Sequence, residues 1–167
     1  MNAFAASEFV TVFEITGNSN GVLMETALRL FIGIAALIGG VRALVRPRRN
    51  NAKDWVGASF AIIFSLFWLY VHNFPHSFGH INTLLRAYRD RHYHLVEGPV
   101  KVIHQQPATG HSKGDLIAVN GEQFEVNYFL FTPAYRKTLA HDGVLGAGVY
   151  ARLYHYNGEI LRIDIRK

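Results

Sequence analysis

The sequence predicts a membrane α-helical hairpin of two transmembrane helices, followed by a small all-β barrel of the OB or SH3-like kind. A charge-free run of twenty residues, 55–74, would span roughly 30 Å as a helix, which is the thickness of a bilayer's hydrocarbon core. After residue 94 apolar and polar residues alternate instead, and two Asn-Gly pairs interrupt the alternation. This second pattern is typical of short antiparallel strands joined by tight turns.

These patterns divide the chain of 167 residues into five segments. Residues 1–21 contain no Lys or Arg, unlike the start of a secretory signal peptide, and we expect an interfacial or disordered segment there. The first transmembrane helix is expected at 22–45, with Glu25 and Arg29 at the spacing of a helical ion pair. The remaining segments are a second transmembrane helix at 55–74, a juxtamembrane linker at 75–94 and the barrel at 95–167.

Small residues recur every four positions along both predicted helices. This spacing lets two helix backbones approach closely inside lipid. We expect these residues to pack the two helices against each other or against another subunit. The candidates are Ala35, Gly39, Gly40, Gly57, Ala61 and Ser65.

The net charge of +5 comes mainly from the segments that flank the helices. Residues 95–167 hold eight basic and seven acidic residues, so a nucleic-acid partner, which needs a basic domain, is not expected. The loop 46–54 and its edges hold five basic residues and one acid. Basic loops tend to stay in the cytoplasm, which predicts a multi-pass protein of the inner or plasma membrane with both termini outside the cytoplasm.

Five strands are expected in the barrel segment, at 97–105, 116–119, 123–128, 149–156 and 159–166. Asn120-Gly121 and Asn157-Gly158 each predict a two-residue hairpin turn, because Asn and Gly tolerate the positive φ that such turns require. A short helical turn is expected within 132–145. The strands suit a closed or half-closed barrel, which would remove most exposed strand edges.

The barrel segment resembles an uncharacterised bacterial family of small β-barrel domains, whereas the membrane hairpin does not share this resemblance. The resemblance implies a fold and carries no activity or site residue. The residues that it rests on are mostly turn and core residues, namely Val96-Glu97-Gly98, Gly110-His111, Val119-Asn120-Gly121, Phe124, Gly146 to Gly148 and Asn157-Gly158.

Two groups of histidines suggest an alternative role in handling a metal or a small ligand. On a continuous helix His72, His76 and His80 would share one face, and such spacing can bind zinc or copper. Pro75 interrupts that helix, however, and polar rings at headgroup depth explain the same residues. His92 and His94 would point the same way in an extended chain. No resident cofactor is expected.

The strand expected at 149–156 places Tyr150, Arg152, Tyr154 and Tyr156 on one face. Aromatic rings beside a guanidinium group can bind a partner or ligand, although tyrosine also simply favours strands. The chain has no cysteine, no phosphate-binding glycine loop, no serine nucleophile elbow and no His-Glu-x-x-His motif, and we therefore expect no enzymatic activity.

These patterns predict a membrane-anchored barrel that acts as a protein-binding or assembly module, or as an accessory subunit of an envelope complex. Its expected partners are the lipid bilayer and either another membrane or envelope protein or a second copy of the chain. The histidine-based metal or ligand role is the alternative.

Overall fold

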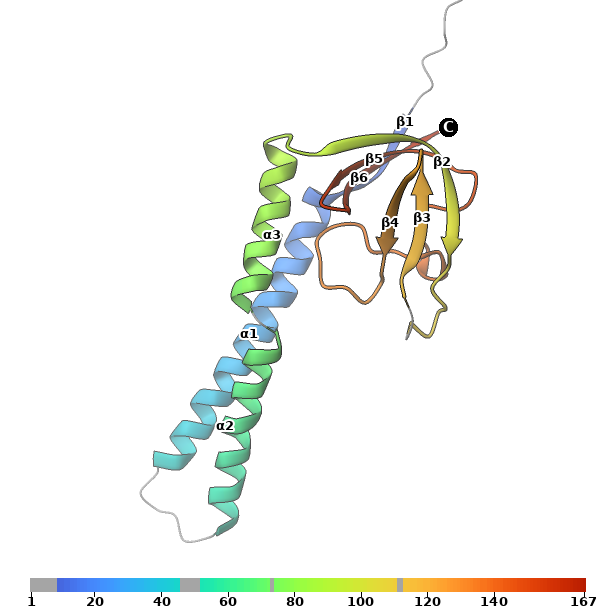
Figure 1. Cartoon of the computed structure of the whole chain (residues 1–167). Coiled ribbons are helices and arrows are strands. Elements are labelled where there is room, and N and C mark those ends of the chain that lie inside the picture. Colours follow the sequence, from blue (N-terminus) through green and yellow to red (C-terminus); the bar gives the residue numbers. More distant parts are fainter. Residues whose placement is uncertain (1–8, 46–51, 73, 111–112) are drawn as a thin grey trace, which may run out of the picture. The chain divides into compact units, whose positions relative to one another are not determined.

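The computed structural model describes residues 9–45, 52–72, 74–110 and 113–167, without the side chains of 17–19, 52–54 and 74–75 (Figure 1). These residues form two compact units. The sheet unit combines the N-terminal residues up to Asn20 with Ile81–Lys167, and the helical unit is Gly21–His80. Two helices, α1 and α3, contribute residues to both units, and each unit is described by itself below.

The helical unit contains α1 (Ile15–Val45), α2 (Ala52–His72) and the start of α3 (Phe74–Arg89). Two segments, Asn20–Val45 and Trp55–Arg89, are long and apolar enough to cross a membrane, and each contains a stretch of 18 residues with a high mean hydropathy, 2.0 in the first and 1.6 in the second. Two apolar helices were predicted here, and α1 begins seven residues earlier than expected, at Ile15 rather than Val22. The Glu25–Arg29 ion pair is confirmed, with 2.7 Å between Oε1 and Nη2.

Helix α3 forms where a linker was expected, and it extends to Arg89. Pro75 is the second residue of α3, a position at which its missing N–H costs no helical hydrogen bond. The proline therefore marks the start of a new helix after α2 ends at His72. This explains why Pro75 interrupts the helical pattern without preventing a helix behind it.

Two glycines of α1 lie against α2. A Cβ atom at Gly40 would come within 2.8 Å of Ile62 Cγ1, and one at Gly33 within 2.8 Å of Leu69 Cδ2. The indole Nε1 of Trp68 also donates a hydrogen bond to the carbonyl oxygen of Arg29, at 3.1 Å. The helices therefore approach each other closely because these α1 positions have no side chain.

The small residues singled out in the sequence divide into two groups. Gly40 is buried against α2, Ala61 Cβ would lie 3.3 Å from a Cβ at Gly40, and Ser65 is buried, with its hydroxyl donating to the Ala61 carbonyl. Ala35 and Gly39 are exposed, and Gly57 likewise has no atom within 4 Å of an added Cβ. Within the helical unit, only the first group packs the hairpin.

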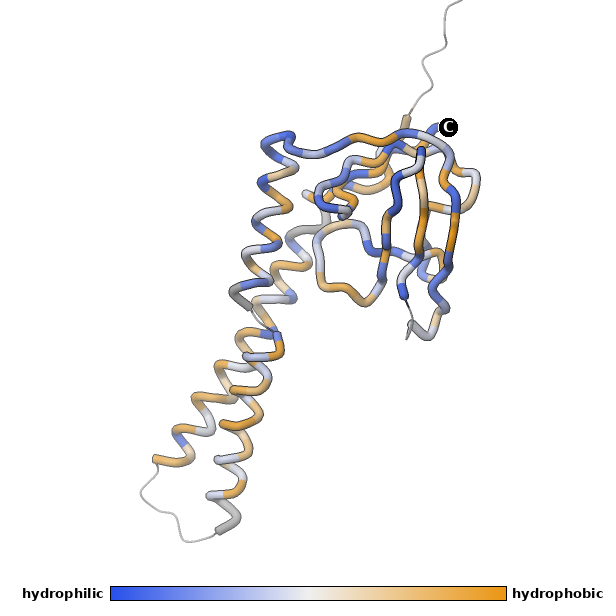
Figure 2. Tube along the Cα trace, viewed as in Figure 1, coloured by the Kyte–Doolittle hydropathy of each residue, from blue (hydrophilic) through white to orange (hydrophobic). Residues whose placement is uncertain are grey.

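Most residues of α1 and α2 are apolar (Figure 2), and many of their large side chains are exposed. Phe31 is 67% exposed, Phe60 69% and Ile63 66%. Among the described residues, most exposed large apolar side chains lie on these two helices.

The sheet unit contains six antiparallel strands in the order β1-β6-β5-β2-β3-β4 (Figure 1). Their bounds are β1 Phe9–Glu14, β2 His94–His104, β3 Asp115–Val119, β4 Glu122–Val126, β5 Tyr150–Tyr156 and β6 Glu159–Arg166. The five strands predicted from the sequence are all present, and β1 is an additional strand in the segment that was expected to be interfacial or disordered. The resulting sheet has β1 and β4 at its edges.

The prediction of a closed barrel is wrong, because the six-stranded sheet stays open. Strand β2 pairs with β5 through His94–Pro99 and with β3 from Val100 onward, which joins two parts of the sheet around one core. In a closed barrel the outer edge of β6 would pair with a strand from the other part. Here β1 occupies that edge, with Phe9 opposite Arg166 and Glu14 opposite Arg162.

One cluster of buried residues fills the space between the two parts of the sheet. It draws on β2, β3, β4, β5, β6 and the long connection from β4 to β5. Its members are Val96, Val100, Ile117, Val119, Phe124, Val126, Tyr135, Leu145, Ala151, Leu153, Ile160 and Ile163. Both predicted Asn-Gly turns are confirmed, since Asn120, Gly121, Asn157 and Gly158 all have positive φ.

The long connection between β4 and β5 contains a 3-10 helix at Leu139–His141, within the segment where a helical turn was predicted. The buried carboxylate of Asp115 holds it in place by accepting hydrogen bonds from the backbone N–H groups of Gln106, at 2.7 Å, and Leu139, at 2.6 Å. Hydrogen bonds from two directions satisfy this carboxylate where water does not reach it.

A second buried cluster covers the other face of the sheet at one end. It comprises Ile15 from the first turn of α1, Leu84 from α3, Ala134 and Leu161. Strand β6 has a register shift beside Leu161, and Ile160 and Leu161 are consecutive buried residues. In a regular strand, consecutive side chains point to opposite faces, and one of the two would be exposed. Here the register shift and the residues from the ends of α1 and α3 bury both faces of β6 at this point.

The paired glycines of α1 allow a matched test of helix packing. Gly40→Ala should lower the stability of the helical unit by roughly 1–3 kcal/mol, because the added methyl group collides with Ile62 and the Ala58 carbonyl. Gly39→Ala should leave stability unchanged or raise it by up to about 1 kcal/mol, because alanine favours helix and the site is open. Thermal unfolding of the full chain in a neutral detergent measures both; equal effects from the two substitutions would contradict the packing described here.

Candidate functional site

Three of the four residues predicted on the β5 face lie together on the outer surface of the sheet. Tyr150, Arg152 and Tyr154 are half-buried, and the residues between them are buried in the core. Neighbouring strands contribute further aromatic and charged groups. The surface, termed here the Tyr–Arg face, consists of Phe9, Thr11, Glu97, Tyr150, Arg152, Tyr154, Arg162, Asp164 and Arg166.

Arg152 occupies the centre of the Tyr–Arg face. Its Nε donates a hydrogen bond to Glu97 Oε2 at 2.8 Å, and its guanidinium carbon lies 4.1 Å from the centre of the Phe9 ring. The hydrogen bond to Glu97 raises the pKa of Arg152 and outweighs the effect of burial. The side chain is therefore held by an ion pair on β2 and a cation–π contact on β1.

Arg166 forms a second guanidinium–aromatic stack beside the first. Its guanidinium carbon lies 3.8 Å from the centre of the Tyr150 ring and 5.6 Å from that of Phe9. One of its nitrogens lies 3.8 Å from Glu97 Oε1, so Glu97 faces two arginines. Rings and guanidinium planes consequently alternate along this end of the sheet.

Arg162 and Asp164 form the most constrained ion pair of the Tyr–Arg face. Arg162 donates to both carboxylate oxygens of Asp164, at 2.8 and 3.1 Å, and the Thr11 hydroxyl donates to the same carboxylate at 2.7 Å. The hydrogen bond to Asp164 raises the pKa of Arg162. Burial alone would raise the pKa of Asp164, but the hydrogen bonds from Arg162 and Thr11 outweigh it and lower that pKa.

A row of tyrosines continues from this pair. The guanidinium of Arg162 lies 5.1 Å from the Tyr154 ring, which meets the Tyr93 ring edge-on at 5.3 Å. Tyr93 stacks on Tyr88 at 5.8 Å, and the Tyr88 hydroxyl donates to Glu14 Oε1 at 2.8 Å. Burial and the neighbouring Glu14 carboxylate raise the pKa of Tyr88.

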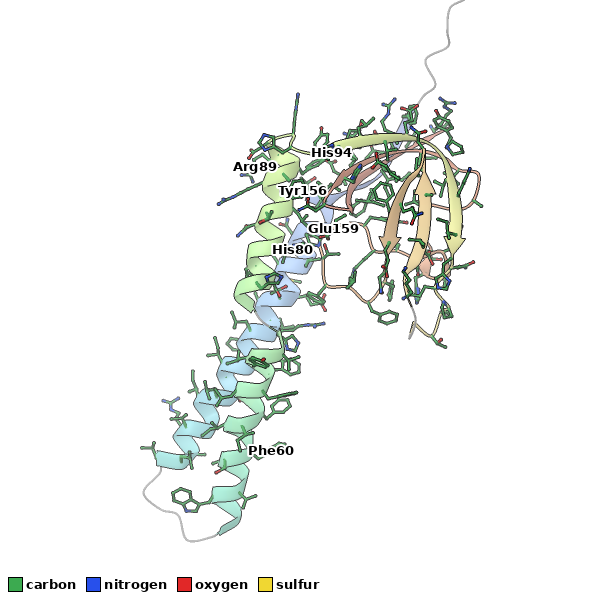
Figure 3. The ribbon with its side chains drawn as sticks, in the orientation of Figure 1. Phe60, His80, Arg89, His94, Tyr156 and Glu159 are labelled. Atoms are coloured by element: carbon green, nitrogen blue, oxygen red, sulfur yellow. The ribbon has the colours of Figure 1, made fainter. Side chains whose placement is uncertain are left out.

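Tyr156, the fourth predicted residue, lies at the end of the same strand. It packs on the second buried cluster, where its partner in the hairpin is Glu159 (Figure 3). The Glu159 carboxylate in turn accepts a hydrogen bond from the Thr132 hydroxyl. Tyr156 therefore contributes to the packing at this end of the sheet.

Sequence reasoning missed the residues that β1 brings to this face. Phe9 and Thr11 lie opposite Arg166 and Asp164, more than 150 residues away along the chain. The run Phe-Val-Thr-Val-Phe from residue 9 to 13 is rich in aromatic and β-branched residues, which favour strands. That local signal was available, but its partner strand was not evident from the sequence.

The histidines of the metal alternative fall in different units. In the helical unit His72 Nδ1 lies 3.0 Å from the Trp68 carbonyl oxygen, and the rings of His76 and His80 lie parallel with centres 6.4 Å apart. In the sheet unit His92 is exposed, and His94 lies opposite His155 across the β2–β5 pair. Among the described residues, no three His, Asp or Glu side chains are grouped as a metal ion would require.

His155 is the buried titratable group of β5. Its Nε2 lies 3.0 Å from Glu122 Oε2, outside the geometry of a hydrogen bond, and its ring meets Phe124 edge-on at 4.8 Å. Burial lowers the pKa of His155; Glu122 opposes this effect and His94, 5.7 Å away between ring centres, adds to it. The ring is therefore favoured in its neutral form.

Comparisons with known protein families, with characterised proteins and with solved structures find no match for this chain.

The lowered pKa of His155 predicts a pH-dependent stability. In the unfolded chain this histidine takes up a proton at about pH 6.5, whereas burial makes the folded ring resist protonation. The contribution of neutral His155 to the free energy of unfolding is therefore complete above that pH and declines as the pH falls below it. His155→Phe should remove this component and make the melting temperature fall less between pH 7.5 and 5.5. The exposed His104 provides the control, since His104→Phe should retain the wild-type slope. Equal slopes for wild type and His155→Phe would contradict the assignment.

Proposed function

We propose that this chain is a membrane-anchored module whose sheet unit binds another protein, as an assembly factor or accessory subunit of a complex in the cell envelope. The observation that carries the membrane part is the exposure of α1 and α2. Only 11% of the residues of each apolar window are buried. A core helix of a water-soluble protein buries its apolar side chains, whereas lipid solvates them.

Lipid is energetically favoured over water as the surroundings of these helices. Removing one large apolar side chain from water contributes about 1.5–3 kcal/mol. Phe31, Phe60 and Ile63 are each about two-thirds exposed, and they represent many such side chains on the two helices. In water this surface would drive aggregation, while insertion into a bilayer removes it from water without a protein partner.

The proposed orientation places the loop 46–54 in the cytoplasm and the sheet unit outside. It rests on the basic residues of the sequence, because 46–51 and the side chains of 52–54 lie outside the described residues. Arg42, Arg46, Arg48, Arg49 and Lys53 surround a single acid, Asp54. Positively charged loops of this kind are retained in the cytoplasm.

The Tyr–Arg face supports the protein-binding part of the proposal. Its carboxylates are already paired with arginines, while Tyr150, Arg152 and Tyr154 stay half-exposed. Tyrosine and arginine are enriched at protein interfaces because they supply large contacts with a polar tip. The exposed Ala35 and Gly39 on α1 would additionally suit close approach by a helix of the partner or of a second copy.

Membrane insertion and orientation are tested with one reporter enzyme placed at two positions. A reporter enzyme active only outside the cytoplasm, fused after Lys167, should be active, and the chain should stay with membranes after alkaline extraction. The same reporter inserted in the loop 46–54 should be silent. Release by alkaline extraction would overturn the membrane proposal, and a reversed reporter pattern would overturn the orientation alone.

Protein binding is tested by photo-crosslinking in intact cells. A photoreactive amino acid at Tyr150 should give one discrete crosslinked product, either to a distinct envelope protein or to a second copy. The matched control is the same amino acid at Gln123, an exposed position on the β4 edge of the same unit. Crosslinking should be lost when Arg152→Ala and Arg166→Ala remove the stacked guanidinium groups. Equal products from both positions, or none from Tyr150, would contradict a partner at the Tyr–Arg face.

A further inference from the structure

A separate cavity of about 350 Å³ lies within the sheet unit, where the first turn of α1 and the end of α3 meet β6. Among the described residues, every ionisable side chain that lines the cavity is an arginine or a tyrosine. The polar groups that line it are Thr16, Tyr88, Arg89, Arg91, Tyr93 and Arg162. Three guanidinium groups around one cavity are an arrangement that suits an anion.

The charges next to the cavity bear on the charge of that anion. Arg162 is paired with Asp164, and Glu14 accepts a hydrogen bond from Tyr88. Asp90 stands between Arg89 and Arg91 in the sequence, although it does not line the cavity. These acids offset the three arginines, which favours the single negative charge of a phosphodiester over the double charge of a phosphomonoester.

Two of the three arginines have donors to offer. In the part of the chain that the structure describes, neither Arg89 nor Arg91 has a side-chain hydrogen bond or an ion pair, and both side chains are exposed. Arg162 stays fixed by its bonds to Asp164 and Thr11. The cavity therefore combines the fixed guanidinium group of Arg162 with those of Arg89 and Arg91, whose N–H groups can still donate hydrogen bonds to a ligand.

The backbone at Arg91 adds an independent observation. Helix α3 ends with hydrogen bonds from Arg91 N to the Tyr88 carbonyl, at 3.3 Å, and from His92 N to the Ala87 carbonyl, at 2.8 Å. This pattern places Arg91 where a helix end usually has glycine, and its φ of 57° is in the left-handed region that side chains disfavour. A strained arginine whose side chain lines a cavity indicates that the side chain is needed there.

We propose that this cavity binds the phosphodiester group of an anionic phospholipid. The inference rests on the membrane anchoring proposed above. Thr16 lies four residues before Asn20, where the candidate membrane-spanning segment of α1 begins. Four residues of helix rise about 6 Å. Along α1, the cavity's threonine therefore lies close to the start of the proposed membrane span, on its headgroup side.

The experiment uses the full chain in a neutral detergent, with phosphatidylglycerol added and binding followed by native mass spectrometry and by the shift in melting temperature. Wild type should bind phosphatidylglycerol in preference to phosphatidylcholine. The Arg89→Gln, Arg91→Gln double variant should bind it at least about tenfold more weakly, because two charge-assisted contacts are lost. The control Arg86→Gln, Lys101→Gln removes the same charge at exposed positions outside the cavity and should bind like wild type.

A third variant separates ligand binding from a purely structural role. Arg91→Gly should raise the melting temperature without lipid, because glycine relieves the left-handed strain, and should at the same time weaken lipid binding. If Arg91→Gly lowers stability and leaves lipid binding intact, the arginine is structural and the proposal is overturned. Undiminished binding in the double variant overturns it as well.

Soluble phosphate compounds form the last arm of the experiment. Inorganic phosphate and glycerol 1-phosphate at millimolar concentration should neither displace phosphatidylglycerol nor raise the melting temperature as it does. Equal protection by either compound would assign the cavity to a soluble ligand and overturn the lipid proposal. These measurements in detergent are independent of alkaline extraction and crosslinking, so the failure of membrane anchoring or of protein binding is recognised separately.

Discussion

The antiparallel pairing of β1 with β6 joins the two ends of the described chain, and most features of the sheet unit depend on it. The pairing covers the outer edge of β6, which keeps the sheet open instead of closing it into a barrel. It brings Phe9 under two arginines and Thr11 onto the Asp164 carboxylate. Because α1 starts directly after Glu14, it also delivers Ile15 to the second buried cluster. Without β1, the contacts of Phe9 and Thr11 that hold the Tyr–Arg face would be absent.

Local signals in the sequence predict most of the elements. The Asn-Gly pairs identify both hairpins because only a few residue types tolerate positive φ, and the charge-free run identifies α2. Alternation along β5 also assigns Tyr150, Arg152 and Tyr154 to one face. Each of these inferences depends on neighbours in the chain, which is why the sequence suffices for them.

The features that sequence reasoning missed depend on distant residues. Nothing near Phe9 reveals that its partner is Arg166. The strands of a barrel and of an open sheet show the same alternation of apolar and polar residues, so the sequence pattern alone does not distinguish the two folds. Tyr156 follows the alternation but packs beside Leu161, because the register shift and the helix ends bury that end of the sheet. Gly39 and Gly40 are the same residue type. Only the position of α2 beside α1 makes Gly40 a packed residue and leaves Gly39 open. The cavity arginines come from α3, the turn that follows it and β6, so no motif joins them.

The order of synthesis gives the β1–β6 pairing a consequence for folding. Thr11 and Asp164 are 153 residues apart, so β1 leaves the ribosome long before its partner β6. At about 5–20 residues per second the interval is roughly 8 to 30 s, which is long compared with the formation of helices and hairpins. During that interval β1 has no partner, while α1 and α2 have both been synthesised. The sheet is thus completed only after both helices have been synthesised, and until β6 has emerged the chain lacks the strand that pairs with β1.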